Sequence, residues 1–259
     1  MLLDAYPEGV KEKDGDDHLP LRLALEREAS AEVVRMLLDA YPEGINERDK
    51  DDHLPLHLAL ERTVPAEVMR MLLDAYPEGV EEKNKDDALP LHHAAKFQAT
   101  AEVMRMLLDA YPEGAKVRNK SGVLPLHVIL ACNGYRYNKY ASAKVVRMLV
   151  DAYPESVKEK DGDDHLPLRL ALKHKKPAGV VGVLVDAYPE DVTDKDGSDR
   201  LFLHYALEQR NSAEVVGVLV DAYPEGVKET DEKGNLPLHC AAKYIVSNEQ
   251  DVVRILMDA

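Results

Sequence analysis

Apolar residues fall in short clusters that return at a constant interval along this chain. One cluster, Leu21 to Leu25, follows a proline and gives a short helix with a broad apolar face. After a polar turn, a second cluster from Val33 to Ala40 covers most of the circumference of a helix. A helix that is apolar on so many sides is packed between neighbours. A charged segment follows, and the order then begins again. The pattern predicts a unit of helix, turn, helix and extended loop.

Polar and special residues mark the ends of these helices. Pro20 suits the first turn of the first helix, where its missing N–H is not needed. Ser30 suits the N-cap of the second helix, because its hydroxyl can accept a free backbone N–H. The string Tyr41-Pro42-Glu43-Gly44 ends this helix, since Pro42 lacks a donor and Gly44 accepts a left-handed turn. We therefore expect a left-handed glycine after the second helix.

Two sequence markers show that the unit repeats along the whole chain. The string Asp-Ala-Tyr-Pro-Glu recurs with its Tyr at positions 6, 41, 76, 111, 153, 188 and 223. Leu-Pro-Leu-His, or a close variant, recurs with its first Leu at 19, 54, 89, 124, 166, 201 and 236. Both markers advance by 35 residues, except for one step of 42. Residues 1–259 therefore form a single array of seven units, numbered here one to seven by that Leu, and 133–140 are an insertion in the fourth unit.

The chain begins and ends inside a unit. It opens on Met1-Leu2-Leu3-Asp4, which matches the internal Met36-Leu37-Leu38-Asp39, and it closes before the next Tyr-Pro. Repeat arrays normally carry end units with polar outer faces. We therefore expect an array truncated at both ends, with apolar residues of the last helix more exposed than their internal equivalents. The residues compared are Val252, Val253 and Leu256 against Val33, Val34 and Leu37.

Composition limits what the array can do. Asp and Glu total 48 against 33 Lys and Arg, a net charge of -15, and this acidic excess argues against general coating of DNA or RNA. No apolar run approaches the roughly 20 residues of a membrane span. The start has no signal-peptide pattern, and two cysteines are too few for a disulfide framework. We expect an intracellular, monomeric protein in the cytoplasm, with the nucleus also open.

The repeated strings resemble the ankyrin repeat. The family opens its unit with Asp-x-x-Gly-x-Thr-Pro-Leu-His-x-Ala-Ala, and Asp231 to Ala242 matches it apart from Leu236, where the family has Thr. Asn119 to His127 is a second close match. The resemblance implies an all-α, ankyrin-like α-solenoid of helix–turn–helix repeats with projecting loops or short β-hairpins. This chain departs in its longer period and in its loop glycine, which survives only as Gly122 and Gly234; Asp takes its place elsewhere, at 17, 52, 87, 164 and 199.

Histidines occupy one position of the repeat. They are His57, His92, His127, His204 and His239, and the other two units carry Arg22 and Arg169 there. A metal ligand or general base would not recur once per repeat and be replaced by Arg. The resemblance implies that this histidine hydrogen-bonds the backbone and braces the loop. We interpret it as a structural part of the repeat motif.

Other chemistry is not indicated. His18, His53 and His165 each follow a pair of aspartates, and Asp and His are metal ligands in principle. Their loop is charged and projects into solvent, so we expect a solvated acidic edge, with no metal site and no cofactor. The sequence contains no nucleophile elbow, phosphate-binding loop or Cys-x-x-Cys motif. We do not expect an enzyme.

The fourth unit breaks the repetition. From Tyr111 to Asp151 it holds seven basic residues and two acidic ones, and its insertion is rich in Tyr. Arg and Tyr are enriched where protein interfaces concentrate their energy. We therefore expect a non-catalytic scaffold that binds another protein through loop tips and first helices. The alternative is binding of nucleic acid or an anionic ligand by the basic, Tyr-containing centre of units four and five. The candidate partner-binding residues are Phe97, Arg118, Lys120, Tyr135, Arg136, Tyr137, Lys139, Tyr140, Lys173, Lys175 and Lys176.

Overall fold

The computed structural model describes residues 7–132, 142–244 and 250–259. The chain forms two compact units, Met1–Val128 and Ile129–Ala259, called the first and the second unit. The seven units of the sequence pattern are called repeats one to seven. The described residues contain α-helices and short 3₁₀ helices, and no strand occurs among them. The all-helical repeat predicted from the sequence is thereby confirmed, with projecting loops in place of β-hairpins.

The elements follow the predicted order in both units. In the first unit they are η1 (Pro7–Lys11), α2 (Pro20–Glu26), α3 (Ala31–Ala40), η2 (Pro42–Asn46), α4 (Pro55–Arg62), α5 (Ala66–Ala75), η3 (Pro77–Glu81), α6 (Pro90–Lys96), α7 (Ala101–Ala110) and η4 (Pro112–Lys116). Helix α8 (Pro125–Ala131) lies where the two units meet in sequence. In the second unit they are α9 (Ala143–Ala152), η5 (Pro154–Lys158), α10 (Pro167–Lys173), α11 (Ala178–Ala187), η6 (Pro189–Thr193), α12 (Phe202–Glu208), α13 (Ala213–Ala222), η7 (Pro224–Lys228), α14 (Pro237–Tyr244) and α15 (Gln250–Asp258).

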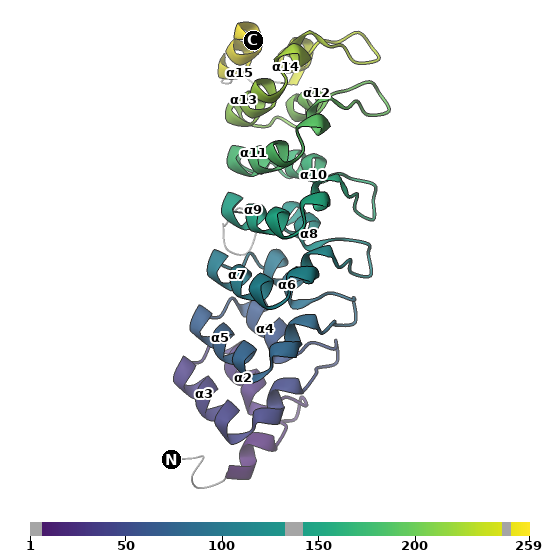
Figure 1. Cartoon of the computed structure of the whole chain (residues 1–259). Helices are drawn as coiled ribbons and strands as arrows, with labels where there is room; N and C mark the ends of the chain where they lie inside the picture. Colours follow the sequence, from purple (N-terminus) through teal and green to yellow (C-terminus); the bar gives the residue numbers. More distant parts are fainter. Residues whose placement is uncertain (1–6, 133–141, 245–249) are drawn as a thin grey trace. The chain divides into compact units, whose positions relative to one another are not determined.

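Within each unit, like helices stack on like. In the first unit α2, α4 and α6 contact one another in succession, and α3, α5 and α7 form a second row (Figure 1). In the second unit the rows are α10, α12, α14 and α9, α11, α13, α15. The connecting loops project from the side of the first helices (Figure 1). Short helices of this length are marginal alone in water, so the packing between rows is what stabilises them.

The core between the rows is aliphatic. Ala59 and Ala94 in the first unit, and Ala171 and Ala206 in the second, are fully buried. These alanines face the neighbouring first helix, where a small side chain lets the helices approach. Leu, Val and Met from the second helices complete the core, as the pattern of apolar residues predicts. Among the described residues, no helix is both long enough and apolar enough to cross a membrane.

The turn after each second helix differs from the prediction. Gly44 does not adopt a left-handed conformation but lies inside the 3₁₀ helix η2. A Cβ atom at this position would come within 3.1 Å of the Tyr41 ring, so glycine is favoured by the close approach of that ring. Gly79 and Gly226 lie equally close to Tyr76 and Tyr223. Glycine is therefore used here for space rather than for backbone freedom.

The left-handed residues lie in the projecting loops and in the turns between the two helices of a repeat, where they are Glu28, Thr63, Gln98, Lys175 and Arg210. The φ angle is positive at Gly122 and Gly234, as it is at the five aspartates that replace this glycine. Asp52, for example, has φ of 64°. A second residue, aspartate in five repeats and Asn84 or Asn119 in the third and fourth, organises each loop. The Oδ1 atom of Asp49 accepts the backbone N–H groups of Asp51 and His53, both at 2.8 Å. Aspartate suits both places because its short side chain tolerates a left-handed backbone and accepts local N–H groups.

The last helix is not exposed in the way expected. Val252 and Leu256 are 1% and 6% exposed, whereas Val33 is 43% exposed. The predicted difference is wrong for Val252 and Leu256 and holds for Val253, which is half-buried where Val34 is buried. Helix α15 is amphipathic: it packs its apolar side on α13 and α14 and turns Asp251 and Arg254 to solvent.

Candidate functional site

The repeated histidine links the first helix to the next repeat in repeats two and three, and His204 keeps only the contact to the next repeat, with the carbonyl oxygen of Asn235 at 3.2 Å. The Nδ1 atom of His57 accepts the backbone N–H of Leu54 at 3.2 Å, which caps the start of α4. That bond leaves the ring proton on Nε2, where it faces the carbonyl oxygen of Ala88 at 3.3 Å in the next repeat. His92 makes the same pair of contacts with Leu89 and Val123. The histidine thus satisfies the backbone N–H of the residue that begins its helix and ties two repeats together.

Two repeats carry arginine in place of this histidine, and there the contact changes. The Nη1 atom of Arg22 lies 2.9 Å from Oδ2 of Asp49, an aspartate in the loop of the next repeat. Arg169 approaches the equivalent Asp196 at 3.8 Å and stacks on the Tyr205 ring, 4.4 Å from its centroid. Arginine therefore reaches outward to a loop carboxylate, whereas histidine reaches inward to a backbone carbonyl.

A pocket opens beside each of these arginines. The Arg22 pocket, of about 380 Å³, lies between the loops of repeats one and two in the first unit. The Arg169 pocket, of about 710 Å³, lies at the equivalent place between repeats five and six in the second unit. Both are lined mainly by charged residues of the two loops, with acids and bases intermixed. Both pockets include the arginine that stands where other repeats carry the buried histidine.

A buried carboxylate distinguishes the Arg169 pocket. Asp191 occupies the place of Gly44, is 3% exposed, and has an Oδ1 atom with no hydrogen-bond partner among the described residues. Burial, reinforced by the nearby charge of Asp194, raises the pKa of Asp191 to about 7. Burial penalises the ionised form because water no longer solvates it.

The structure separates the candidate partner-binding residues predicted from the sequence. The five in the insertion, at 135, 136, 137, 139 and 140, lie outside the described residues. Phe97 ends α6 half-buried, with the Lys96 ammonium 5.4 Å from its ring centroid. Arg118 and Lys120 lie in the loop of the fourth repeat, where Lys120 is exposed and Arg118 donates to the carbonyl oxygen of Gly122.

The three lysines in the inter-helix turn of the fifth repeat, at 173, 175 and 176, differ in their exposure. Lys173 and Lys175 are exposed, as a surface for a partner requires. Lys176 is only 2% exposed, and its Nζ atom donates to the carbonyl oxygen of Cys132. The expectation that Lys176 contributes to a surface patch is therefore wrong: its stem is packed in the repeat, and its ammonium group is used by a backbone acceptor.

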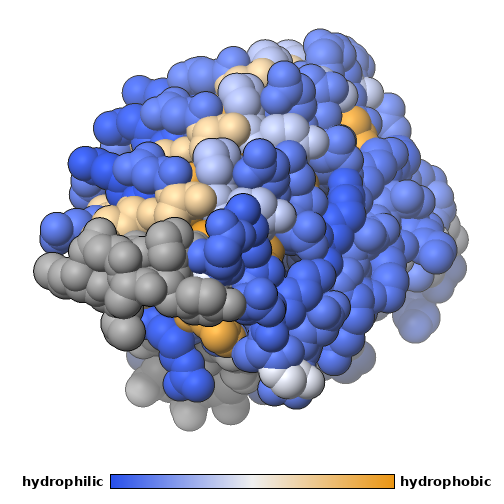
Figure 2. All heavy atoms as spheres, turned by 90° about the horizontal axis from the view of Figure 1, so that it is seen from below, coloured by the Kyte–Doolittle hydropathy of each residue, from blue (hydrophilic) through white to orange (hydrophobic). Residues whose placement is uncertain are grey.

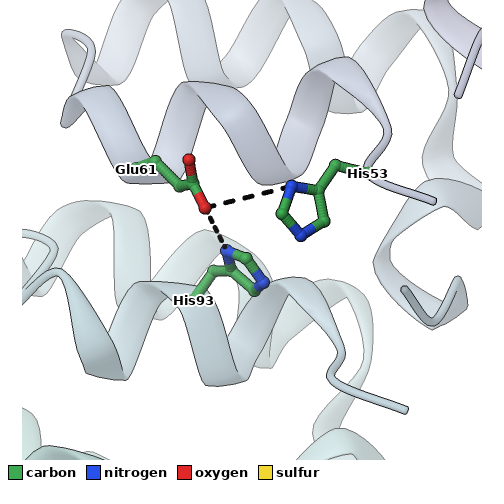
Figure 3. Close-up of side chains that lie close together, drawn as sticks. All are labelled: His53, Glu61 and His93. Carbon is green, nitrogen blue, oxygen red and sulfur yellow. Dashed lines mark ion pairs between the residues drawn. The ribbon is translucent and has the colours of Figure 1, made fainter. Parts of the chain in front are cut away.

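A cluster of histidines and one glutamate lies between repeats two and three. His53 comes from the loop before α4, Glu61 from α4 and His93 from α6, and the three side chains point toward one another (Figure 3). The Oε1 atom of Glu61 lies 3.5 Å from Nδ1 of His93 and 4.0 Å from Nδ1 of His53. The His93 side chain is 6% exposed, and His57 packs against it with ring centroids 4.9 Å apart.

Burial and charge fix the protonation of this cluster. Burial lowers the pKa of His93, so the ring is neutral near pH 7. Contact with His93 lowers the pKa of Glu61, which is therefore a carboxylate. The arrangement combines two imidazoles and a carboxylate, the types of group that bind first-row divalent metals.

Sequence reasoning missed this cluster and the role of Arg22 and Arg169, although a signal was present. At the position of His93, the other repeats carry Leu23, Leu58, Val128, Leu170, Tyr205 and Cys240. A single histidine in a column of mostly apolar residues marks a buried polar side chain. In the column of Gly44 the other repeats carry glycine except for Ser156 and Asp191, and Asp191 is the one charged member.

Two solved structures resemble this one closely in fold. The ankyrin repeat domain of Bcl-3, described as a unique member of the IkappaB protein family, aligns with a TM-score of 0.64 at 20% identity, covering 93% of this chain and 99% of that one. The ankyrin repeat domain of human ASB11 aligns with a TM-score of 0.66 at 20% identity, covering 93% and 97%. No family model and no curated protein matches the sequence. The likeness is one of structure, and it shows that this chain has the ankyrin repeat fold.

Proposed function

We propose that this chain is a non-catalytic scaffold that binds another protein through its projecting loops and first helices. The observation that carries the proposal is the pair of pockets beside Arg22 and Arg169. Each opens between two loops, where side chains differ most from repeat to repeat.

The chemistry of these pockets suits side chains of a protein. One pocket contains the ion pair of Arg22 with Asp49. The other contains Arg169, which approaches Asp196 and stacks on the ring of Tyr205. A surface with both signs of charge selects a partner by complementary charges rather than by net attraction. The rest of the described surface is largely hydrophilic, as the N-terminal end in Figure 2 illustrates outside the atoms drawn in grey. Its exposed large hydrophobic residues are few: Val33, Met36, Leu238 and Met257.

The test uses the histidine of the other repeats as the replacement. In the double variant Arg22→His and Arg169→His, each substituted repeat regains the inward-reaching side chain, so folding is retained. Partners are captured from the source cell with the wild-type chain, and the affinity of each purified partner is then measured by calorimetry. We expect the double variant to bind at least ~10-fold more weakly, as loss of a central interface residue does.

Arg105→His provides the matched control, because Arg105 is an exposed residue of α7, a second helix. It introduces the same chemical change away from the loops and should leave the affinity unchanged. A partner that binds the double variant as tightly as the wild type, or that is lost with Arg105→His, contradicts the proposed surface.

Binding of a nucleic acid or an anionic ligand is the competing function, and salt distinguishes it. Binding driven by phosphate weakens steeply as salt rises, because counterions are released on association. Single-stranded RNA can be titrated into the protein at low and physiological salt, with Lys173→Glu/Lys175→Glu as the variant. Tight binding with a steep salt slope, lost in that variant, would replace the scaffold proposal with this alternative.

A further inference from the structure

The cluster of His53, Glu61 and His93 is a combination of residues that occurs once in the array. The loop position of His53 is also histidine in repeats one and five, and Glu61 has a Glu equivalent in repeats one and six. Only repeat three places a histidine at the position of His93. The three therefore meet once, between repeats two and three. A polar ring in a core position is unfavourable unless its nitrogen atoms are paired, so a compensating contact is required.

The pairing of His93 within the protein is incomplete. Its Nδ1 atom has no hydrogen-bond partner that meets normal geometry, and the nearest polar atom, Oε1 of Glu61, is 3.5 Å away. That separation exceeds the 2.7–3.2 Å of an ordinary N–H···O bond. The His93 side chain is 6% exposed, so water does not replace the missing partner freely. A buried nitrogen thus points into the space between two further ligand-type side chains.

We propose that His53, Glu61 and His93 form a binding site for a zinc ion, Zn²⁺, that cross-links repeat two and repeat three. Two nitrogens and one carboxylate oxygen, with a water molecule as fourth ligand, make a common tetrahedral zinc environment. Metal bonds of ~2.0–2.1 Å place two ligands of a tetrahedral ion about 3.3–3.5 Å apart. The separation of Glu61 and His93 already meets this value, and the ligand atoms of the whole cluster lie within 4.8 Å of one another.

The remaining adjustment falls on His53. Its Nδ1 atom lies 4.0 Å from the Glu61 oxygen and must move closer by less than about 1 Å. This side chain is 18% exposed and sits in a loop, so a small ring rotation is possible there. The exposed edges of His53 and Glu61 also provide the path by which the ion and its water enter.

The hydrogen bond between Asn84 and His93 lowers the affinity of the site for zinc. The Oδ1 atom of Asn84 accepts the backbone N–H groups of Asp86 and Ala88, so its Nδ2 group faces Nε2 of His93 at 3.0 Å. This amide donates to Nε2 and favours the ring proton on Nδ1. Zinc on Nδ1 requires the proton on Nε2 instead, so the Asn84 amide must turn its oxygen toward the ring and give up its two backbone bonds.

A substitution at Asn84 should therefore raise the affinity for zinc, which tests the proposal. Asp49 is the equivalent of Asn84 in repeat two and shows that an aspartate fits there. Its Oδ1 atom accepts the backbone N–H groups of the loop, and its Oδ2 atom remains available and lies 3.6 Å from Nδ1 of His53. Asn84→Asp should therefore keep the loop and present a carboxylate that accepts the Nε2 proton of His93. Such an orienting partner changes metal affinity by about 10–100-fold. Asn119→Asp makes the same charge change one repeat further on and is the matched control.

The experiment titrates Zn²⁺ into the full chain against a chromophoric chelator, with Co²⁺ absorption reporting tetrahedral geometry. We expect one Zn²⁺ per chain at this site, binding at least ~10-fold weaker in His93→Leu and Glu61→Gln, and about 10-fold tighter in Asn84→Asp than in Asn119→Asp. His93→Leu restores the residue of repeats one, two and five and so should fold; circular dichroism checks this. His165→Asn, at the position of His53 in repeat five, should leave the site intact.

Two results overturn the proposal. The first is a wild-type chain that binds no Zn²⁺, or binds it with an affinity that His93→Leu leaves unchanged. The second is weaker binding in Asn84→Asp than in wild type, which would show that Nδ1 of His93 is not a ligand. Neither result bears on the scaffold function, because the cluster and the two loop pockets are tested by separate variants.

Discussion

The Nζ atom of Lys176 donates a hydrogen bond to the carbonyl oxygen of Cys132, 44 residues earlier in the chain. Cys132 follows the last turn of α8, where backbone carbonyls lack intrahelical partners and the helix dipole favours a cation. In the next repeat Asn211 stands at the position of Lys176, and its Nδ2 group donates to the carbonyl oxygen of Leu172. The inter-helix turn of one repeat thus satisfies the first helix of the preceding one.

Removal of this ammonium group should destabilise the second unit. Lys176→Met keeps the packed stem but leaves the Cys132 carbonyl without its donor, so we expect a loss of about 1–3 kcal/mol in the free energy of unfolding. Chemical denaturation measures it, with exposed Lys173→Met as the control, expected within ~0.5 kcal/mol of wild type. A Lys176→Met chain as stable as wild type would mean that desolvation of the ammonium outweighs its hydrogen bond.

Acid should destabilise the protein through its buried histidines. Burial lowers the pKa of His57 to about 3 and of His92 to about 4, against 6.5 when unperturbed. Below pH 6.5 the unfolded chain takes up protons that the folded chain does not, so stability falls with pH until the folded pKa is reached. Each histidine contributes about 1.4 kcal/mol per pH unit in that window.

Denaturation curves between pH 7.5 and 4.5 measure this dependence. His57→Gln removes one titrating ring, so its stability should fall less steeply with acid than that of the wild type. Equal slopes in the two proteins would show that His57 is protonated in the folded state.

Asp191 should have the opposite pH dependence. Its carboxyl group has a pKa of about 7 when folded, above the usual 3.8 of an aspartate, so between these values the folded state holds a proton that the unfolded state has lost. Its contribution to stability therefore decreases as pH rises from 4 to 7. Asp191→Gly restores the residue of repeat two and should stabilise the chain by about 1–4 kcal/mol at pH 8 and by little at pH 4.5. Melting temperatures at the two pH values test this, with Asp221→Asn, at an exposed position of α13, as the control.

The loop aspartates should resist replacement by branched residues. Asp52 has φ of 64°, a left-handed conformation that costs a β-branched residue about 1–2 kcal/mol. Asp52→Val should lose that amount in denaturant unfolding, whereas Asp52→Gly, the residue of repeats four and seven, should remain within ~1 kcal/mol of wild type. A Val variant as stable as the Gly variant would mean that the loop can change its backbone conformation.

The repeat itself was predictable because two sequence markers carry it independently. The Tyr-Pro string and the Leu-Pro-Leu string keep one period, and each coincides with a helix boundary in the structure. The exchange of Asp for Gly in the loops was also visible, since Asp52 and Gly122 occupy one column and both have positive φ. Helix boundaries and loop residues that recur in every repeat can be predicted from the sequence, because the same residue types return at the same position of each repeat.

Features that occur once were not predictable in the same way. Lys176 was expected on the surface because lysine is rarely buried, yet its position is a core position filled by Val64 in repeat two. The reason for Gly44 was also wrong, since its need for space depends on where the Tyr41 ring packs. His53, Glu61 and His93 come together only through the stacking of α4 on α6, which no spacing in the sequence specifies.

The tyrosine that follows α3, α5, α7, α9, α11 and α13 has a spectroscopic consequence. Where glycine stands three positions on, the ring lies against it: a Cβ atom at Gly44 would come within 3.1 Å of the Tyr41 ring, and the chain contains no tryptophan. Near-ultraviolet absorption and emission therefore arise mainly from rings seated once per repeat. A single Tyr→Trp exchange at 76 or at 223 would place one distinct fluorophore in a chosen repeat, and the order in which repeats lose their structure could be followed one at a time.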